Sequence, residues 1–230
     1  DFVLEGKTYK APAGVAHYLE HKMFDLPGDR DVSAEFAAMG AMTNAFTSYD
    51  MTAYYFSGAE EFQKNLELLL EFVSTPYFTP ESVEKEQGII GQEIDMVADT
   101  PDSRVFENLM EIMYGVHPVR IPILGTRETI GSITPEVLYR CHRAFYRPEN
   151  MMLCVVGDVD AREICATAER MLPQNPPQTV EKDTWQEPMT VLQPETTCKM
   201  EVAMPLFQLG FKCEPQDHGE EAVRLEMVGD

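Results

Sequence analysis

The chain has 230 residues, of which 18 are Lys or Arg and 39 are Asp or Glu, so its formal net charge is −21. A nucleic-acid-binding face needs a surplus of basic residues, and an anionic membrane would repel this chain, so we expect neither partner. Because 44% of the residues are apolar, the chain can build a packed core, which excludes general disorder. The length suits one large domain, or one domain with part of a second.

The chain carries neither a candidate membrane span nor a signal-peptide pattern at its start. Its five cysteines are odd in number, widely spaced and without a C-x-x-C pair: Cys141, Cys154, Cys165, Cys198 and Cys213. We therefore expect free thiols in a reducing compartment, rather than a disulfide framework or a cysteine-rich zinc site. This cysteine usage predicts a cytoplasmic location.

The first part of the chain alternates helices with a pair of strands. We expect helices over residues 14–24 and 32–39, the second ending before a glycine. Residues 41–46 and 52–56 read as two strands joined by a short connection, and the second is rich in aromatic side chains. Apolar residues at helical spacing predict an amphipathic helix over residues 62–73.

Three later helices are marked by a threonine followed by a proline, at Thr79-Pro80, Thr100-Pro101 and Thr134-Pro135. The hydroxyl can cap the helix, and proline is tolerated at the first helical position. The apolar run 151–156 is typical of a buried strand, and residues 160–171 of another helix.

The composition changes near residue 173, where prolines become frequent and helical periodicity is lost. Beyond this stretch we expect strands over residues 196–204 and 206–212 and the start of a helix over 220–227. These features predict a domain over 1–172, a linker over 173–195 and the beginning of a second domain over 196–230.

The most informative segment is the pattern His17-x-x-Glu20-His21. On a helix these three side chains point within a sector of about 100°. Two imidazoles one turn apart can bind one zinc ion, and the carboxylate between them can reach a water on that metal. The pattern therefore predicts a catalytic zinc site.

A catalytic zinc ion needs a third protein ligand, and the predicted helix after Pro80 offers two candidates, Glu86 and Glu93. They are seven residues apart and differ by only about 20° in direction. One could bind the metal while the other holds a histidine or the water network. Without the histidine motif, such a pair would indicate only a solvated helix face.

The pattern H-x-x-E-H is the inverted zinc motif of the inverzincins. The sequence around it resembles the insulinase/pitrilysin family, which includes the mitochondrial processing peptidases. The resemblance is closest to small bacterial members built as two related halves. It is carried by residues 14–24, 43–48 with 54–56, 84–94, and 146–159.

This resemblance implies an α/β (α+β) fold with a largely antiparallel sheet and helices packed on one face, as in the processing peptidases. It implies a zinc-dependent endopeptidase with Zn²⁺ as cofactor and an extended peptide as substrate. By the family's pattern, His17, His21 and Glu93 are metal ligands, Glu20 is the general base, and Glu86 is an auxiliary catalytic acid. Asn44, Ala45 and Phe46 match the edge strand that binds the substrate.

The sequence departs from the family pattern in two places. The motif begins only sixteen residues into the chain, so the strands that precede the zinc helix in the family are expected to be missing. The partner half is represented by at most 196–230, so we expect a second half-domain or partner subunit to complete the site. We expect these residues alone to be weakly active or inactive. We also expect their free strand edges to favour self-association into a homo-oligomer.

Two other functions remain open. One is a noncatalytic scaffold subunit of a two-chain peptidase, although such a subunit would have no chemical need for an intact motif. The other is a metalloenzyme like S-ribosylhomocysteine lyase, which shares H-x-x-E-H but uses a cysteine as third ligand. No cysteine precedes Cys141 here, whereas Glu93 is well placed.

Overall fold

The computed structural model describes residues 1–28, 30–173, 180–182 and 184–213, and the chain divides into two compact units. The first unit contains residues 1–97 and 122–184, and the second contains residues 98–121 and those from 185 onward. Every predicted site residue lies in the first unit.

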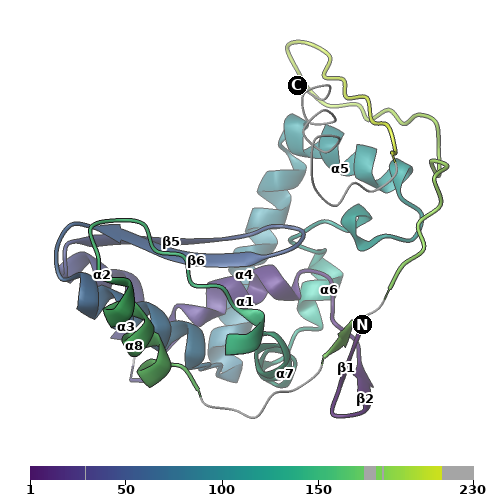
Figure 1. The fold of residues 1–230 in the computed structure, drawn as a ribbon. Helices are drawn as coiled ribbons and strands as arrows, with labels where there is room; N and C mark the ends of the chain where they lie inside the picture. Colours follow the sequence, from purple (N-terminus) through teal and green to yellow (C-terminus); the bar gives the residue numbers. More distant parts are fainter. Residues whose placement is uncertain (29, 174–179, 183, 214–230) are drawn as a thin grey trace. The chain divides into compact units, whose positions relative to one another are not determined.

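The described elements confirm most of the predicted helices and the hairpin (Figure 1). In the first unit they are β1 (Phe2–Leu4), β2 (Lys7–Tyr9), α1 (Val15–Met23), β3 (Asp25–Leu26), β4 (Arg30–Asp31), α2 (Val32–Ala38), β5 (Ala41–Thr47), β6 (Thr52–Gly58), α3 (Phe62–Ser74), α4 (Pro80–Ala98), α6 (Arg127–Gly131), α7 (Pro135–Phe145), α8 (Ala161–Met171) and β7 (Glu181–Lys182). The second unit contains α5 (Pro101–Met113) and a short 3₁₀ turn at Pro118–Arg120. Another 3₁₀ turn, Pro148–Asn150, lies in the first unit.

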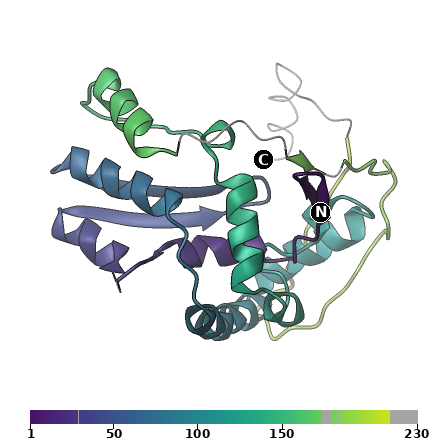
Figure 2. The same ribbon diagram turned by 90° about the horizontal axis from the view of Figure 1, so that it is seen from below.

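The strands confirm an α/β fold in which pairing is antiparallel. Among the described residues they form a three-stranded sheet, β2-β1-β7, and two pairs, β3-β4 and β5-β6. Helices α1, α2 and α3 contact the long β5–β6 ribbon, and Figure 1 shows them below it. Figure 2 shows α7 crossing α1, with which it is in contact.

The helices and the ribbon enclose an apolar core in the first unit. Its fully buried members include Tyr18 and Met23 from α1, Phe36 from α2 and Phe72 from α3. The rings of Phe36 and Phe72 are 6.2 Å apart, edge to face, an arrangement that aromatic pairs favour. This core fixes α1 beneath the ribbon, and α1 carries the H-x-x-E-H motif.

The start of α1 depends on a close approach of two backbone segments. Gly14, the residue before the helix, has a φ of 91°, a left-handed conformation that favours glycine. A Cβ at this position would also clash with the carbonyl oxygen of Leu124. The facing Gly125 has a φ of 71°, and a Cβ there would clash with the carbonyl of Ala13. The two glycines therefore let the loop before α6 lie directly against the start of the motif helix.

We expect Gly14→Ala to destabilise the protein by roughly 2 kcal/mol or more, because it combines backbone strain with a steric clash. Gly88→Ala is the matched control, since this exposed glycine within α4 has open space around its Cβ position. That substitution should be neutral or stabilise by about 0.5–1 kcal/mol. Urea unfolding of both variants measures the difference, and equal stabilities would contradict the close approach.

Three predicted strands are wrong. Residues 151–156 form no strand, and Met152 and Val156 are 93% and 94% exposed. Residues 196–204 and 206–212 are likewise without strand structure. An apolar run becomes a buried strand only when neighbouring strands satisfy its backbone, and no such partner lies among the described residues. The predicted helix over 220–227 lies outside the described residues.

The second unit is organised by a carboxylate clamp at Glu187. Its two oxygens accept hydrogen bonds from the backbone N–H groups of Gly115, Val116 and His117 at 2.7–2.8 Å. The Lys212 ammonium donates to the same carboxylate at 2.7 Å. The hydrogen bond from Lys212, supported by the backbone donors, lowers the pKa of Glu187 to about 2. The clamp therefore joins three separate chain segments through one charged group.

This clamp predicts a pH-dependent local stability. Because the folded pKa of Glu187 lies below its ordinary value of 4.5, its contribution is complete above that pH and is lost as pH falls toward about 2. We expect Glu187→Gln to speed amide exchange at residues 115–117 near pH 7, with a ratio to wild type that approaches one near pH 2. Glu195→Gln, at an exposed position, is the control. An acceleration that does not depend on pH would contradict the charged clamp.

Candidate metal centre

Two helices, α1 and α4, position the candidate site. α1 carries His17, Glu20 and His21, and α4 carries Glu86 and Glu93. The two helices are joined by a buried hydrogen bond, in which the hydroxyl of Tyr18 donates to the carbonyl of Val83 at 2.5 Å. Burial raises the pKa of Tyr18 well above its ordinary value, so this phenol stays a donor across the physiological range.

His17, His21 and Glu93 form a group that could hold a metal ion, with one ligand atom from each lying within 4.8 Å of the others. His17 Nε2 is 3.6 Å from Glu93 Oε1, and His21 Nε2 is 3.5 Å from Glu93 Oε2. Two ligand atoms that each lie ~2.1 Å from a tetrahedral zinc ion are separated by ~3.4 Å. Each histidine thus lies at about this separation from one oxygen of Glu93, which is compatible with a shared zinc ion.

Glu86 lies on the other nitrogen of His21. His21 Nδ1 is 2.9 Å from Glu86 Oε1, and because an ionised carboxylate can only accept, Nδ1 carries the proton. That tautomer leaves the lone pair of Nε2 directed toward Glu93, as a metal ligand requires. The hydrogen bond to Glu86 raises the pKa of His21. Burial opposes ionisation of Glu86, but its hydrogen bond and attraction to His21 give a net lowering of its pKa.

His17 is the most buried member of the group, at 7% exposure. Burial, together with the neighbouring His21, lowers the pKa of His17 to about 4, so its imidazole is neutral and able to bind a metal at physiological pH. Its Nδ1 has no hydrogen-bond partner among the described residues. Burial and the nearby carboxylates of Glu20 and Glu86 raise the pKa of Glu93. A cation in this group would compensate that crowding of negative charge.

The position of Glu86 predicts an intermediate effect on metal binding. We expect Glu86→Gln to weaken zinc affinity by about 10–100-fold, because it weakens the hydrogen bond that orients His21 without removing a ligand. Glu84→Gln is the matched control, since Glu84 is exposed on the same helix. Competition with a fluorescent chelator measures both affinities. Equal zinc affinity in Glu86→Gln and wild type would show that Glu86 does not support metal binding.

Glu20 does not belong to the group of three but lies beside it on α1. Its Oε2 accepts a hydrogen bond of 2.6 Å from the hydroxyl of Thr47, at the end of β5. Sequence reasoning did not assign a role to Thr47. The alternation of side chains along β5 places Thr47 on the same face as the other odd-numbered residues. These residues are less exposed than the even-numbered ones.

A pair of tyrosines lies near Glu20. The hydroxyl groups of Tyr54 and Tyr146 are 2.6 Å apart, joining β6 to the segment after α7. Burial raises the pKa of Tyr54 strongly and that of Tyr146 to about 12, and the charge of Glu20 contributes to both shifts. Both phenols are therefore neutral near pH 7. Both tyrosines lie in segments that carry the family resemblance, 54–56 and 146–159, but no sequence pattern indicates their function.

The predicted substrate residues lie on β5, which among the described residues pairs only with β6. Asn44 and Phe46 are exposed, while Ala45 is partly buried on the same side as Thr47. The N–H of Ala45 donates to the side-chain oxygen of Asn44 at 2.8 Å. The three residues are thus adjacent along the strand but divided between its two faces.

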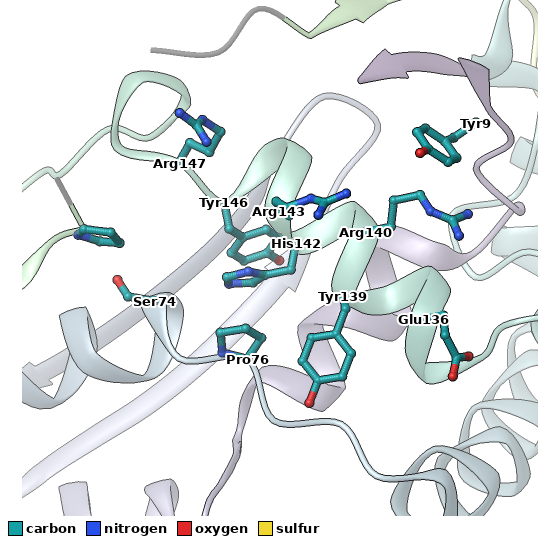
Figure 3. Close-up of a pocket in the computed structure, with 11 residues that line it drawn as sticks. Tyr9, Ser74, Pro76, Glu136, Tyr139, Arg140, His142, Arg143, Tyr146 and Arg147 are labelled. Carbon is teal, nitrogen blue, oxygen red and sulfur yellow. The ribbon is translucent and has the colours of Figure 1, made fainter. Parts of the chain in front are cut away.

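A separate cavity of about 710 Å³ lies beside α7, and Figure 3 shows its lining. His142 and Tyr146 stack in its wall with ring centroids 4.7 Å apart, and Arg140 and Arg143 belong to the same helix. None of the predicted site residues lines it. The group that could hold a metal ion and this cavity are therefore two different features of the first unit.

An H-x-x-E-H motif on a helix, with Glu93 near both histidines, is typical of the inverzincins. Residues 4–127 match the family model described as insulinase, peptidase family M16, and residues 132–228 match the model of the M16 inactive domain. The chain therefore belongs to the insulinase family of peptidases, as the resemblance in its sequence indicated.

The chain is similar to several relatives over part of their length. It is 43% identical to an uncharacterized zinc protease, YmfH, from Bacillus subtilis, over 98% of this chain and 54% of the relative. A putative M16-like peptidase from Alicyclobacillus acidocaldarius has a TM-score of 0.79 and 45% identity, covering 83% of this chain and 46% of that chain. The periplasmic protease PqqL from Escherichia coli has a TM-score of 0.64 and 28% identity, covering 76% and 21%.

The chain thus spans about half the length of the relatives it matches best among these. The names of the relatives support a hydrolase that depends on zinc. In the described part of the chain, no helix has both the length and the apolar character needed to cross a bilayer.

Proposed function

We propose that the full-length protein containing this chain is a zinc-dependent endopeptidase that hydrolyses extended peptide segments. The observation that carries the proposal is the convergence of His17, His21 and Glu93, with Glu20 beside them on α1. Family membership supports a peptidase role, and the relatives' names support zinc as the cofactor.

The proposed roles follow from the contacts of each side chain. His17, His21 and Glu93 would hold the ion, and Glu86 would keep His21 in the correct tautomer. A bound zinc ion would supply acidity to water and polarise the scissile carbonyl. Glu20, which is not one of the ligands, would accept the proton of the attacking water and pass it to the leaving amine.

The β5 strand would bind the substrate by main-chain pairing, which favours extended peptides and gives little sequence preference. In this proposal Asn44, Ala45 and Phe46 form the binding edge. A peptide that pairs with the Ala45 N–H would displace the Asn44 side-chain oxygen that now accepts from it. The exposed Asn44 amide is then free to contact the peptide itself.

The completed site would include a second half-domain or a partner subunit, since the chain spans 54% of its Bacillus relative. We keep the division into a peptidase domain over 1–172, a linker over 173–195 and a second half from 196 as part of the proposal. Peptides are the proposed substrates, and the cytoplasm is the proposed location.

Two alternatives are less well supported by the site. A noncatalytic scaffold subunit would not require Glu20 beside an intact group of ligands. A lyase with a cysteine ligand would place a thiol near His17 and His21, whereas the metal-ligating group among the described residues contains Glu93 and no cysteine.

The experiment is a cleavage assay of the full-length protein on unstructured peptides, with products identified by mass spectrometry. We expect cuts at internal bonds, loss of cleavage after treatment with a zinc chelator, and recovery when zinc is restored. The Glu20→Gln variant, purified in the same way, controls for contaminating proteases. Cleavage that survives complete removal of metal, or that is equal in Glu20→Gln, would contradict the proposed function.

A further inference from the structure

We infer that Thr47 is the positioning residue of Glu20, and that it selects which carboxylate oxygen takes the proton from water. This inference rests on the proposed function, in which Glu20 is the general base. Thr47 itself contacts neither substrate nor metal in this account. It acts by fixing the orientation of Glu20.

The contact between the two residues is short and joins distant parts of the chain. Thr47 Oγ1 lies 2.6 Å from Glu20 Oε2, and 27 positions in the sequence separate the residues. Both side chains are partly buried, so water competes less for this hydrogen bond than it would on an open surface. Among the described residues, the other oxygen of Glu20, Oε1, has no hydrogen-bond partner.

The direction of the hydrogen bonds follows from what each group can donate. An ionised carboxylate only accepts, so the single hydroxyl proton of Thr47 points to Glu20. Thr52 Oγ1 lies 3.2 Å from Thr47 Oγ1, and since the proton of Thr47 is already used, Thr52 is the donor in that contact. The Thr52 hydroxyl therefore donates to Thr47 Oγ1, and the Thr47 hydroxyl donates to Glu20 Oε2.

The hairpin register holds this series in place. Thr47 and Thr52 face each other as the last pair of the β5–β6 ladder. The turn that follows is closed by a hydrogen bond of 2.8 Å from the Ser48 N–H to the Met51 carbonyl. Because α1 packs against β5, the hydroxyl of Thr47 meets Glu20 at a fixed position.

This geometry gives the two carboxylate oxygens of Glu20 different roles. Oε2 is occupied by a donor and is therefore the weaker proton acceptor, which leaves Oε1 to take the proton. Without the hydroxyl, the carboxylate can rotate about its terminal torsion and lose alignment with the water. The loss should appear in the chemical step rather than in metal or substrate binding.

The test compares Thr47→Val, which keeps the shape but removes the hydroxyl, with Thr47→Ser, which keeps the hydroxyl. In the full-length protein we expect Thr47→Val to lower kcat by about 10–100-fold while KM changes by less than about threefold. Thr47→Ser should stay within about threefold of wild type in both constants. Zinc affinity should be unchanged in both variants.

A second measurement does not depend on turnover. A phosphinic peptide, which imitates the tetrahedral transition state, should bind Thr47→Val more weakly than wild type by a similar factor. In the Glu20→Gln background, Thr47→Val should cause no further loss, because its effect passes through Glu20. If Thr47→Val does not fold, Thr47→Ala carries the same expectations.

The outcomes separate this inference from the proposed function. Normal kcat and normal phosphinic-peptide affinity in Thr47→Val, with Glu20→Gln impaired, overturn the role of Thr47 alone. An equal loss in Thr47→Ser and Thr47→Val also overturns it, because the hydroxyl would then not be the cause. Absence of cleavage in wild type, or full activity of Glu20→Gln, overturns the proposed function and with it the role of Thr47.

Discussion

Glu20→Gln should retain zinc but lose most of its peptidase activity, with kcat/KM reduced by about 10²–10⁴-fold. The reason is that Glu20 lies beside the proposed ligands His17, His21 and Glu93 without belonging to that group. The glutamine oxygen can still accept the hydrogen bond from Thr47, but the amide cannot take a proton from water. The local structure should therefore survive while proton transfer is lost.

The measurement combines zinc content with peptide cleavage on the same preparations. Glu84→Gln, at an exposed position of α4, is the control and should match wild type in both. Loss of zinc from Glu20→Gln would mean that Glu20 is a ligand instead of the base. Cleavage by Glu20→Gln near the wild-type rate would show that Glu20 is not the general base.

His21→Ala should abolish stoichiometric zinc binding, which is the second large effect. The substitution removes one of the three proposed ligands and also the partner of Glu86. The hydrogen bond and the charge of His21 lower the pKa of Glu86 in the wild type, so we expect Glu86 to take up a proton more readily in the variant.

Elemental analysis of the full-length variant measures this directly, with Glu20→Gln as the control that keeps the metal. Because the histidine nitrogens must be unprotonated to bind metal, zinc retention by the wild type should also fall as pH decreases. Stoichiometric zinc in His21→Ala would falsify the assignment of this residue as a ligand.

The sequence was sufficient to place the motif and its helix. The spacing of His17, Glu20 and His21 on a helix requires only local geometry, and α1 confirms that helix. The same reasoning placed Glu86 and Glu93 on one helix face but left their roles open. In the structure their contacts differ, because Glu93 lies near Nε2 of both histidines, whereas Glu86 contacts Nδ1 of His21.

What the sequence could not predict depends on contacts between distant segments. Thr47 is an ordinary strand threonine until the packing of α1 against β5 brings it to Glu20. The short strands β1, β2 and β7 contain only two or three residues each, too few for an alternating pattern to be recognised. The apolar run at 151–156 predicts a strand, but periodicity cannot show whether a partner strand exists.

The most direct test of the central claim is the zinc X-ray absorption spectrum of the full-length protein, which reports the atoms bound to the metal. Our account predicts nitrogen and oxygen neighbours at about 2.0–2.2 Å, with the scattering pattern of two imidazoles. These correspond to His17, His21 and the carboxylate of Glu93. A sulfur neighbour near ~2.3 Å, or the pattern of fewer than two imidazoles, would contradict the site proposed for this chain.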